Sequence, residues 1–129
     1  MTTIVVSAAI VERDGRFLIT RRQKGVHLEG YWEFPGGKCE AGESMEACVG
    51  RELREELDVD VQVGEEILKT SHVYPTQTVE LHFLSCRLLG EPRPQVGQEM
   101  QWASREELPR LAFPPADSAL IQVLTSRSA

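Results

Sequence analysis

Residues 36–59, GGKCEAGESMEACVGRELREELDV, join a glycine pair and a charged turn to a predicted helix that carries three glutamates. At about 100° per residue, Glu52, Glu55 and Glu56 fall on one face of that helix. The neighbouring face is apolar and can be buried; it contains Val49, Leu53 and Leu57. Because like charges repel, the glutamate cluster favours hard divalent cations bound by oxygen, Mg²⁺ first and Mn²⁺ as a substitute. The alternative is an ordinary solvated acidic face.

The spacing of residues 36–59 resembles the Nudix box. Gly37 is followed by five residues and Glu43, then by seven residues and the run RELREE at residues 51–56, and Val59 closes the pattern. So many fixed positions make the match specific. At one position the chain departs from the family, which usually has Gly where Asp58 follows the helix. Asp tolerates a left-handed C-cap, so this departure predicts a small loss of stability and unchanged chemistry.

The resemblance implies an α/β fold, the Nudix α/β/α sandwich with a mixed β-sheet between helices, in a single domain over residues 1–129. It implies pairing of Glu43 with Arg51, which would hold the loop against the helix. The implied metal ligands are the Gly36 carbonyl and the carboxylates of Glu52, Glu55 and Glu56. One of these carboxylates, or a glutamate from a loop, would act as the general base.

Composition is that of a soluble globular protein, with 41% hydrophobic and 26% charged residues. The net charge of −6 argues against binding to nucleic acid or to an acidic membrane surface. No apolar run reaches membrane-spanning length, and no signal-like N-terminus precedes the first strand. Cys39, Cys48 and Cys86 lack CxxC spacing, which predicts reduced thiols in a cytoplasmic protein, with neither a disulfide framework nor a zinc site. The short chain leaves no room for an extra dimerisation domain, which argues against enzymes that hydrolyse ADP-ribose, dinucleoside polyphosphates or a dinucleotide cofactor. A monomer or weak dimer is expected.

Alternating apolar residues predict strands over residues 4–11, 17–19, 59–63, 67–74, 78–89 and 100–103, and Asp14-Gly15 predicts a hairpin turn. A short strand at residues 32–35 would lead into a Gly36-Gly37 turn. His27, His72 and His82 are not at metal-ligand spacing, so we interpret them as ordinary surface or sheet histidines.

Two side chains near this turn are candidates for contact with substrate. Arg22 ends a strand where MutT-like Nudix enzymes place an arginine that reaches the substrate; the alternative is a surface charge. By the same resemblance Phe34 lines the base pocket; the alternative is a core aromatic residue.

Glu99 is a further candidate for metal binding or for the general base. Many MutT-like enzymes carry an extra glutamate in the loop before the strand that bears Trp102. The usual position of that glutamate corresponds to Val96 here, and Glu99 lies three residues later. The alternative is an exposed loop carboxylate.

The segment FPPAD at residues 113–117 resembles the base-recognition segment of MutT-like nucleotide sanitisers. Asp117 would then contact the base; the alternative is an N-cap of the last helix. An ionised Asp accepts a hydrogen bond from an amine such as N4 of cytosine, whereas a protonated Asp can read the edge of an oxidised guanine.

The resemblance implies a metal-dependent nucleoside triphosphate pyrophosphohydrolase, a sanitiser of the nucleotide pool that acts on 8-oxo-dGTP-type substrates. One alternative is a CTP, dCTP or 5-methyl-dCTP pyrophosphohydrolase, and another is a Nudix hydrolase of a different nucleoside diphosphate derivative. A catalytically silent nucleotide-binding module is the non-enzyme alternative. Such modules usually lose box carboxylates, and this chain keeps all three.

Overall fold

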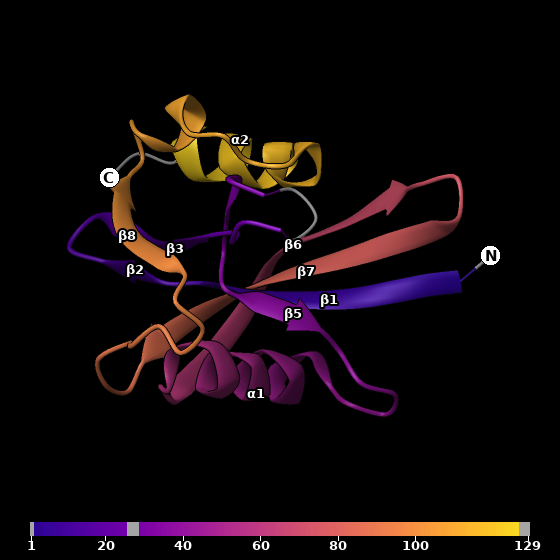
Figure 1. The fold of residues 1–129 in the computed structure, drawn as a ribbon, viewed down its shortest axis with the longest axis horizontal. Helices are drawn as coiled ribbons and strands as arrows, with labels where there is room; N and C mark the ends of the chain where they lie inside the picture. Colours follow the sequence, from indigo (N-terminus) through magenta and orange to yellow (C-terminus); the bar gives the residue numbers. More distant parts are fainter. Residues whose placement is uncertain (1, 26–28, 127–129) are drawn as a thin grey trace.

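The computed structural model describes residues 2–25 and 29–126, and in these residues two β-sheets lie between two α-helices (Figure 1). The first sheet is mixed, because β1 runs parallel to β7 while the other neighbours are antiparallel. Its strands in spatial order are β5 (Gly36–Lys38), β1 (Thr2–Ile10), β7 (Gln77–Leu88) and β6 (Val61–Val73). The second sheet is antiparallel and contains β2 (Glu12–Arg13), β3 (Arg16–Arg21), β4 (Trp32–Glu33) and β8 (Glu99–Ser104).

The helices cover opposite sides of these sheets. In Figure 1, α1 (Met45–Leu57) lies below the strands and α2 (Ser118–Ser126) lies above them. Strand alternation in β3 supplies both cores, since Phe17 and Ile19 pack on the α2 side while Leu18 packs on the α1 side. The predicted α/β fold with a mixed sheet between helices is confirmed, and the antiparallel second sheet is an addition to it.

Local signals at the first hairpin and at the C-terminus of α1 are confirmed, and a serine caps its N-terminus. Asp14 and Gly15 both have positive φ, 53° and 75°, as a two-residue turn between paired strands requires. The Ser44 hydroxyl accepts a backbone N–H at 3.0 Å and caps the N-terminus of α1. At the other end Asp58 adopts the left-handed conformation, with φ 49° and ψ 45°.

Three predicted boundaries are wrong. The strands expected at residues 59–63 and 67–74 form the single strand β6, which tolerates the intervening residues because its register with β7 shifts on both sides of Glu66. The expected Gly36-Gly37 turn lies in β5, because both glycines pair with β1. The capping box at residues 104–107 predicts a short helix that ends at Pro109, but Pro109 lies inside the 3₁₀ helix η1 (Leu108–Arg110).

The prediction of three reduced cysteines is also wrong for two of them. Cys39 and Cys48 form a disulfide, with their Cα atoms 5.2 Å apart. The turn around Gly42, whose φ is +80°, folds the box loop back so that Cys39 meets the first turns of α1. Cys86 is the free, buried thiol, and burial raises its pKa to about 12. Spacing alone did not indicate this pairing, because turn geometry brings the two residues together.

Within the described part of the chain, no helix has both the length and the apolar character needed to cross a bilayer. The predicted surface position of His27 lies outside the described residues.

Candidate active site

The two box glycines let β5 pass between β1 and the carboxylates of α1. A Cβ atom at Gly37 would lie 2.5 Å from the Glu52 carboxylate, and a Cβ at Gly36 would overlap the Ser7 carbonyl. Any larger residue would therefore displace either the strand or the glutamate. The Gly36 N–H also donates a hydrogen bond to Glu56 Oε2 at 3.1 Å, which holds this carboxylate against the strand.

Arg51 joins the box loop to the glutamates of α1, as predicted. Its Nε and Nη2 donate to both carboxylate oxygens of Glu43, at 2.8 and 2.9 Å. Its Nη1 donates to Glu52 at 3.0 Å and to Glu55 at 3.3 Å. The hydrogen bonds from Arg51 lower the pKa of Glu43 to about 2, so this pair stays ionised. Arg51 therefore fixes the position of the loop and orients two of the three box glutamates.

The box glutamates differ in their surroundings. Burial raises the pKa of Glu56 to about 8, and the nearby charges of Glu33 and Glu52 add to the shift. Burial also raises the pKa of Glu52, whose side chain is 15% exposed. Glu55 is the outer member, with a side chain that is 59% exposed. Partly buried carboxylates that repel one another are the arrangement that a dication stabilises.

A cavity of about 380 Å³ is lined by Glu56 of α1 and by Asp117, the residue before α2. Other polar groups in its lining include Arg22, Glu33 and the Gly36 backbone. Its apolar lining comes from two strands and comprises Ile4, Val6, Ala8, Val79, Leu81 and Phe83. A pocket with both charged and apolar walls suits a ligand that carries phosphates and a flat ring.

Phe34 lines this cavity and also belongs to the core. It is 5% exposed and stacks on Phe113, with ring centroids 5.3 Å apart and planes inclined by 21°. Its ring meets Phe83 edge-on at 6.5 Å. The two interpretations of Phe34 are therefore compatible, since one face of a core aromatic can form a pocket wall.

Asp117 ends the 3₁₀ helix η2 (Pro115–Asp117), immediately before α2, and lines the same cavity. It is 8% exposed. Burial raises the pKa of Asp117 to about 7, with a further contribution from the charge of Glu33. Near neutral pH this carboxyl can therefore be protonated or ionised.

No sequence pattern singles out Glu33, which lines the same cavity as Glu56 and Asp117. Arg22 donates to Glu33 at 2.9 Å. Burial raises the pKa of Glu33, and the paired Arg22 partly offsets this shift. The charge of Glu33 adds to the effect of burial in raising the pKa of both Glu56 and Asp117, so Glu33 lies close enough to interact with both carboxyls. The one available signal was a carboxylate between two apolar residues, Trp32 and Phe34, next to the glycine pair.

Glu99 has a different partner. It is the first residue of β8, opposite Arg21 in register, and the two side chains form an ion pair at 3.4 Å. Its side chain is 64% exposed and does not line the cavity. Its neighbour Gln98 instead donates to the Glu56 carbonyl at 3.1 Å. The role of Glu99 stays a prediction.

The model of the NUDIX domain family matches residues 6–123. The chain belongs to the Nudix hydrolase family. The glycine pair, the Glu43–Arg51 pair and the three glutamates described above are therefore its Nudix box, and the family expectation drawn from residues 36–59 is confirmed.

Several Nudix relatives cover almost the whole chain. The CTP pyrophosphohydrolase of Escherichia coli K12 is 36% identical over 123 residues, which is 95% of this chain and 91% of that protein. The 8-oxo-dGTP diphosphatase of Haemophilus influenzae is 35% identical over 127 residues, 97% of this chain and 93% of that protein. The solution structure of the E. coli ORF135 protein superposes with a TM-score of 0.85 at 36% identity, covering 95% of this chain and 88% of that one.

Nudix hydrolases generally need a divalent metal ion, and the donors of this site fit one. All the side-chain donors of the cluster are carboxylate oxygens, which hard dications prefer. The raised pKa values of Glu52 and Glu56 show that their negative charge is incompletely compensated by Arg51 and the Gly36 amide.

Proposed function

We propose that the chain is a nucleoside triphosphate pyrophosphohydrolase that converts a nucleoside triphosphate and water into a nucleoside monophosphate and diphosphate. The observation that carries this proposal is a cavity lined by both Glu56 and Asp117. The cavity also contacts the box residues Gly36 and Gly37 and is lined by Phe34, which can pack against a base. We propose that residues 1–129 act as one domain.

Mg²⁺ is the proposed cofactor, with Mn²⁺ as a substitute. Glu52, Glu55, Glu56 and the Gly36 carbonyl would hold it. A bound dication would neutralise phosphate oxygens, acidify water and stabilise the leaving diphosphate. Arg51 keeps Glu52 and Glu55 oriented, and the Gly36 amide keeps Glu56 in place. A glutamate of this group, or Glu99, would accept the proton of the attacking water.

Arg22 would contact the substrate from the wall of the cavity, held there by its ion pair with Glu33. Such a pair restricts the guanidinium to few rotamers before the substrate arrives. This arrangement supports a positioning role for Glu33 in the proposed reaction.

Asp117 would set the base preference. With a pKa of about 7 it can present either an O–H donor or a carboxylate acceptor. We propose 8-oxo-dGTP-type substrates first, read by the protonated form. CTP, dCTP and 5-methyl-dCTP form the second candidate class, because an ionised Asp117 accepts from an N4 amine. Relatives named for each activity are about equally similar to this chain.

We further propose that the protein acts in the cytoplasm on free nucleotides, as a monomer or weak dimer that binds neither nucleic acid nor membranes. The net charge of −6 supports this, since an acidic protein is repelled by polyphosphate backbones. Metal ions in the cavity would allow a small phosphate ligand to bind despite that charge.

The test is hydrolysis of a panel of 8-oxo-dGTP, dGTP, CTP, dCTP, 5-methyl-dCTP and ADP-ribose at low concentration, with Mg²⁺ and with chelator. Chromatography separates the products, which are a nucleoside monophosphate and diphosphate from each triphosphate, and AMP and ribose 5-phosphate from ADP-ribose. Selective hydrolysis of 8-oxo-dGTP would support the sanitiser, and preference for cytosine nucleotides would support the pyrimidine enzyme. Preference for ADP-ribose would move the protein to another Nudix class. Metal binding without hydrolysis of any compound would favour a silent binding module.

The matched variant for this panel is Asp117→Asn, which keeps the shape and removes the titration. If Asp117 reads the base, Asn should change the ratio of kcat/KM between 8-oxo-dGTP and dCTP by about tenfold or more, as expected for one buried hydrogen bond. An unchanged ratio would contradict base reading by Asp117.

A further inference from the structure

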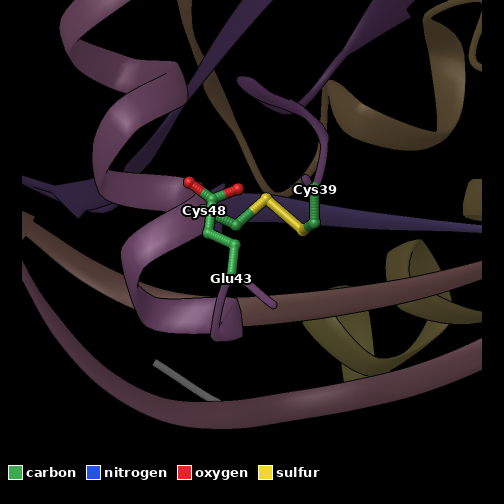
Figure 2. Close-up of side chains that lie close together, drawn as sticks. All are labelled: Cys39, Glu43 and Cys48. Carbon is green, nitrogen blue, oxygen red and sulfur yellow. A yellow bond between two sulfur atoms is a disulfide. The ribbon is translucent and has the colours of Figure 1, made fainter. Parts of the chain in front are cut away.

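The Cys39–Cys48 disulfide closes the Nudix box loop onto its helix. Figure 2 shows the bond joining α1 to the segment that carries Cys39, with the Glu43 carboxylate beside Cys48. A carboxylate oxygen of Glu43 and both sulfur atoms lie within 4.8 Å of one another. Since the two sulfurs are bonded together, this group is a crosslink and not a metal site in this state.

The crosslink lies next to the contacts that orient the glutamates. The Cys39 N–H donates to the Val5 carbonyl at 2.8 Å, which anchors one end of the loop to β1. At the other end Glu43 accepts from the Glu40 N–H at 2.9 Å and binds Arg51 through both oxygens. Arg51 in turn donates to Glu52 and Glu55. A continuous set of bonds thus connects the disulfide to two of the proposed metal ligands.

We propose that this disulfide is a reversible redox clamp, whose opening loosens the Glu43–Arg51 pair and weakens divalent metal binding by the box. The metal-binding part of this inference rests on the proposed function. Disulfides in reducing compartments are mostly transient and regulatory, so a reversible bond is also consistent with the proposed cytoplasmic location.

The two sulfurs differ in their access to a reductant. Cys39 is partly exposed, whereas Cys48 is fully buried in α1. A thiolate of a dithiol reductant would attack Cys39 Sγ, the Cys39–Cys48 bond would break, and Cys48 would leave as a thiolate that takes a proton from water. The second thiolate of the reductant would then attack the mixed disulfide and release Cys39. The protein gains two electrons and two protons, and the dithiol becomes a disulfide.

Opening the bond restores conformational freedom to the loop between Cys39 and Cys48. The Glu43–Arg51 pair must then hold the loop without covalent help, and Arg51 spends less time oriented toward Glu52 and Glu55. Loss of groups that orient metal ligands typically lowers metal affinity by about 10–100-fold. Release of a disulfide in a domain of this size should also lower Tm by about 5–10 °C.

The experiment compares the oxidised wild-type protein with the same protein reduced by dithiothreitol and desalted without oxygen. Thiols are counted by mass spectrometry after iodoacetamide labelling of the unfolded chain, with one label expected before reduction and three after it. Mn²⁺ binding is then measured by electron paramagnetic resonance, which needs no substrate, and Tm by calorimetry. Reduction should weaken Mn²⁺ binding about tenfold, and oxidised dithiothreitol should restore it.

The double variant Cys39→Ser/Cys48→Ala should have the Mn²⁺ affinity and Tm of the reduced protein, and dithiothreitol should change neither. Cys86→Ala is the matched control, because it removes the buried thiol on β7 and should respond to reduction as the wild type does. A disulfide that the folded protein never forms, or does not release to dithiothreitol, would overturn the inference. Equal Mn²⁺ affinity in both redox states would also overturn it while leaving the proposed function intact. Failure of both states to bind Mn²⁺ would instead refute the proposed metal site, and the clamp with it.

Discussion

At the scale of single residues, the site depends on carboxyl groups whose surroundings drive their pKa values apart. Glu43 is held ionised by Arg51 with a pKa near 2, while burial raises the pKa of Glu56 to about 8 and that of Asp117 to about 7. The first has a structural partner inside the protein. The carboxyls of Glu56 and Asp117 have no such partner that fully balances their charge, and both line the cavity. A bound cation could balance Glu56 there, and a nucleotide base could hydrogen-bond to Asp117.

Glu56→Gln tests the box glutamates. Gln keeps an oxygen that can accept from the Gly36 amide but removes a charge that Glu33 and Glu52 repel. Metal-dependent turnover should fall by about 10²–10³-fold, while the metal-free protein should unfold at an equal or higher temperature. Diphosphate release and calorimetry measure the two effects, and Glu55→Gln should likewise lose turnover without unfolding. Full activity in either variant would refute the metal-cluster assignment.

Asp117→Asn tests the buried carboxyl through the pH dependence of stability. The folded-state pKa of Asp117, about 7, lies above its ordinary value of 3.8. The bound proton therefore stabilises the fold fully below pH 4, and this contribution is lost as pH rises through 7. As pH rises from 5 to 8, the variant should therefore gain about 2–3 kcal/mol of stability relative to wild type, since one pKa unit corresponds to about 1.4 kcal/mol. Urea unfolding at both pH values checks this, and a pH-independent difference would contradict it.

Glu99→Gln tests the remaining candidate base. Because Glu99 is exposed and paired with Arg21, its loss should reduce kcat by less than about threefold, as for a surface ion pair. The comparison is with Glu56→Gln under the same Mg²⁺ concentration. A loss as large as that of Glu56→Gln would show that Glu99 leaves Arg21 during turnover and serves as base or metal ligand.

At the scale of elements, α1 is defined by its two ends and one buried face. Ser44 satisfies a free N–H at the start, and Asp58 turns the chain into the left-handed conformation at the end. The buried face of α1 places Val49, Leu53 and Leu57 in the core shared with β1 and β7. With that face fixed, the helix face that carries the glutamates is directed toward β5, where Glu52 lies against Gly37. Helix packing therefore sets the orientation of the face that carries the box glutamates.

Asp58→Gly restores the residue usual in the family and should raise the free energy of unfolding by about 0.5–1 kcal/mol, because glycine adopts positive φ without a Cβ penalty. Diphosphate release should be unchanged. The matched control is Asp60→Gly, an exposed position without positive φ, where glycine should be neutral or destabilising. Equal effects at both positions in urea unfolding would contradict a conformational origin.

At the scale of the whole molecule, the candidate site is built from elements that are far apart in the sequence. The cavity is lined by residues of β1 and β7, of β4, β5 and α1, and of η2. A ligand that binds there contacts elements from most of the chain. Binding should therefore stabilise the entire fold and not one segment alone.

Mg²⁺ should raise Tm. At a free concentration a hundred times its Kd the gain is about 2.7 kcal/mol, or about 10 °C for a chain of this size. Chelator should reverse the shift, and Glu56→Gln should abolish it. Calorimetry at constant ionic strength, with NaCl as the control salt, measures the effect. An equal rise in the variant would indicate general ionic stabilisation and not occupation of the Nudix box.

Several features of the site were predictable because they depend on neighbours in the sequence. The Glu43–Arg51 pair, the cap at Ser44 and the left-handed Asp58 all lie within one loop and one helix, where spacing determines geometry. His82 was expected to be a sheet histidine with its hydrogen bonds satisfied. It is hydrogen-bonded to Glu80 on its own strand, β7, and to Glu66 on the adjacent strand, β6.

Other features needed the tertiary structure. Glu33, Glu56 and Asp117 are far apart in the chain, and their pKa values depend on burial and on distances that only packing sets. Whether Cys39 pairs with Cys48 depends on a turn that places two Cα atoms within bonding range. The continuous β6 depends on a register shift against β7, which no pattern inside β6 reveals.

Residues 36–59 resemble the Nudix box closely enough to imply the family and the fold class. Helix periodicity, which acts over a few residues, placed the three box glutamates on one face. Residues 36–59 left open which carboxyl groups share a cavity, how strongly each holds a proton, and whether the box loop is crosslinked. Those properties arise because folding brings charges and sulfur atoms together from different parts of the chain. Their energies depend on the exclusion of water, which occurs only in the folded protein.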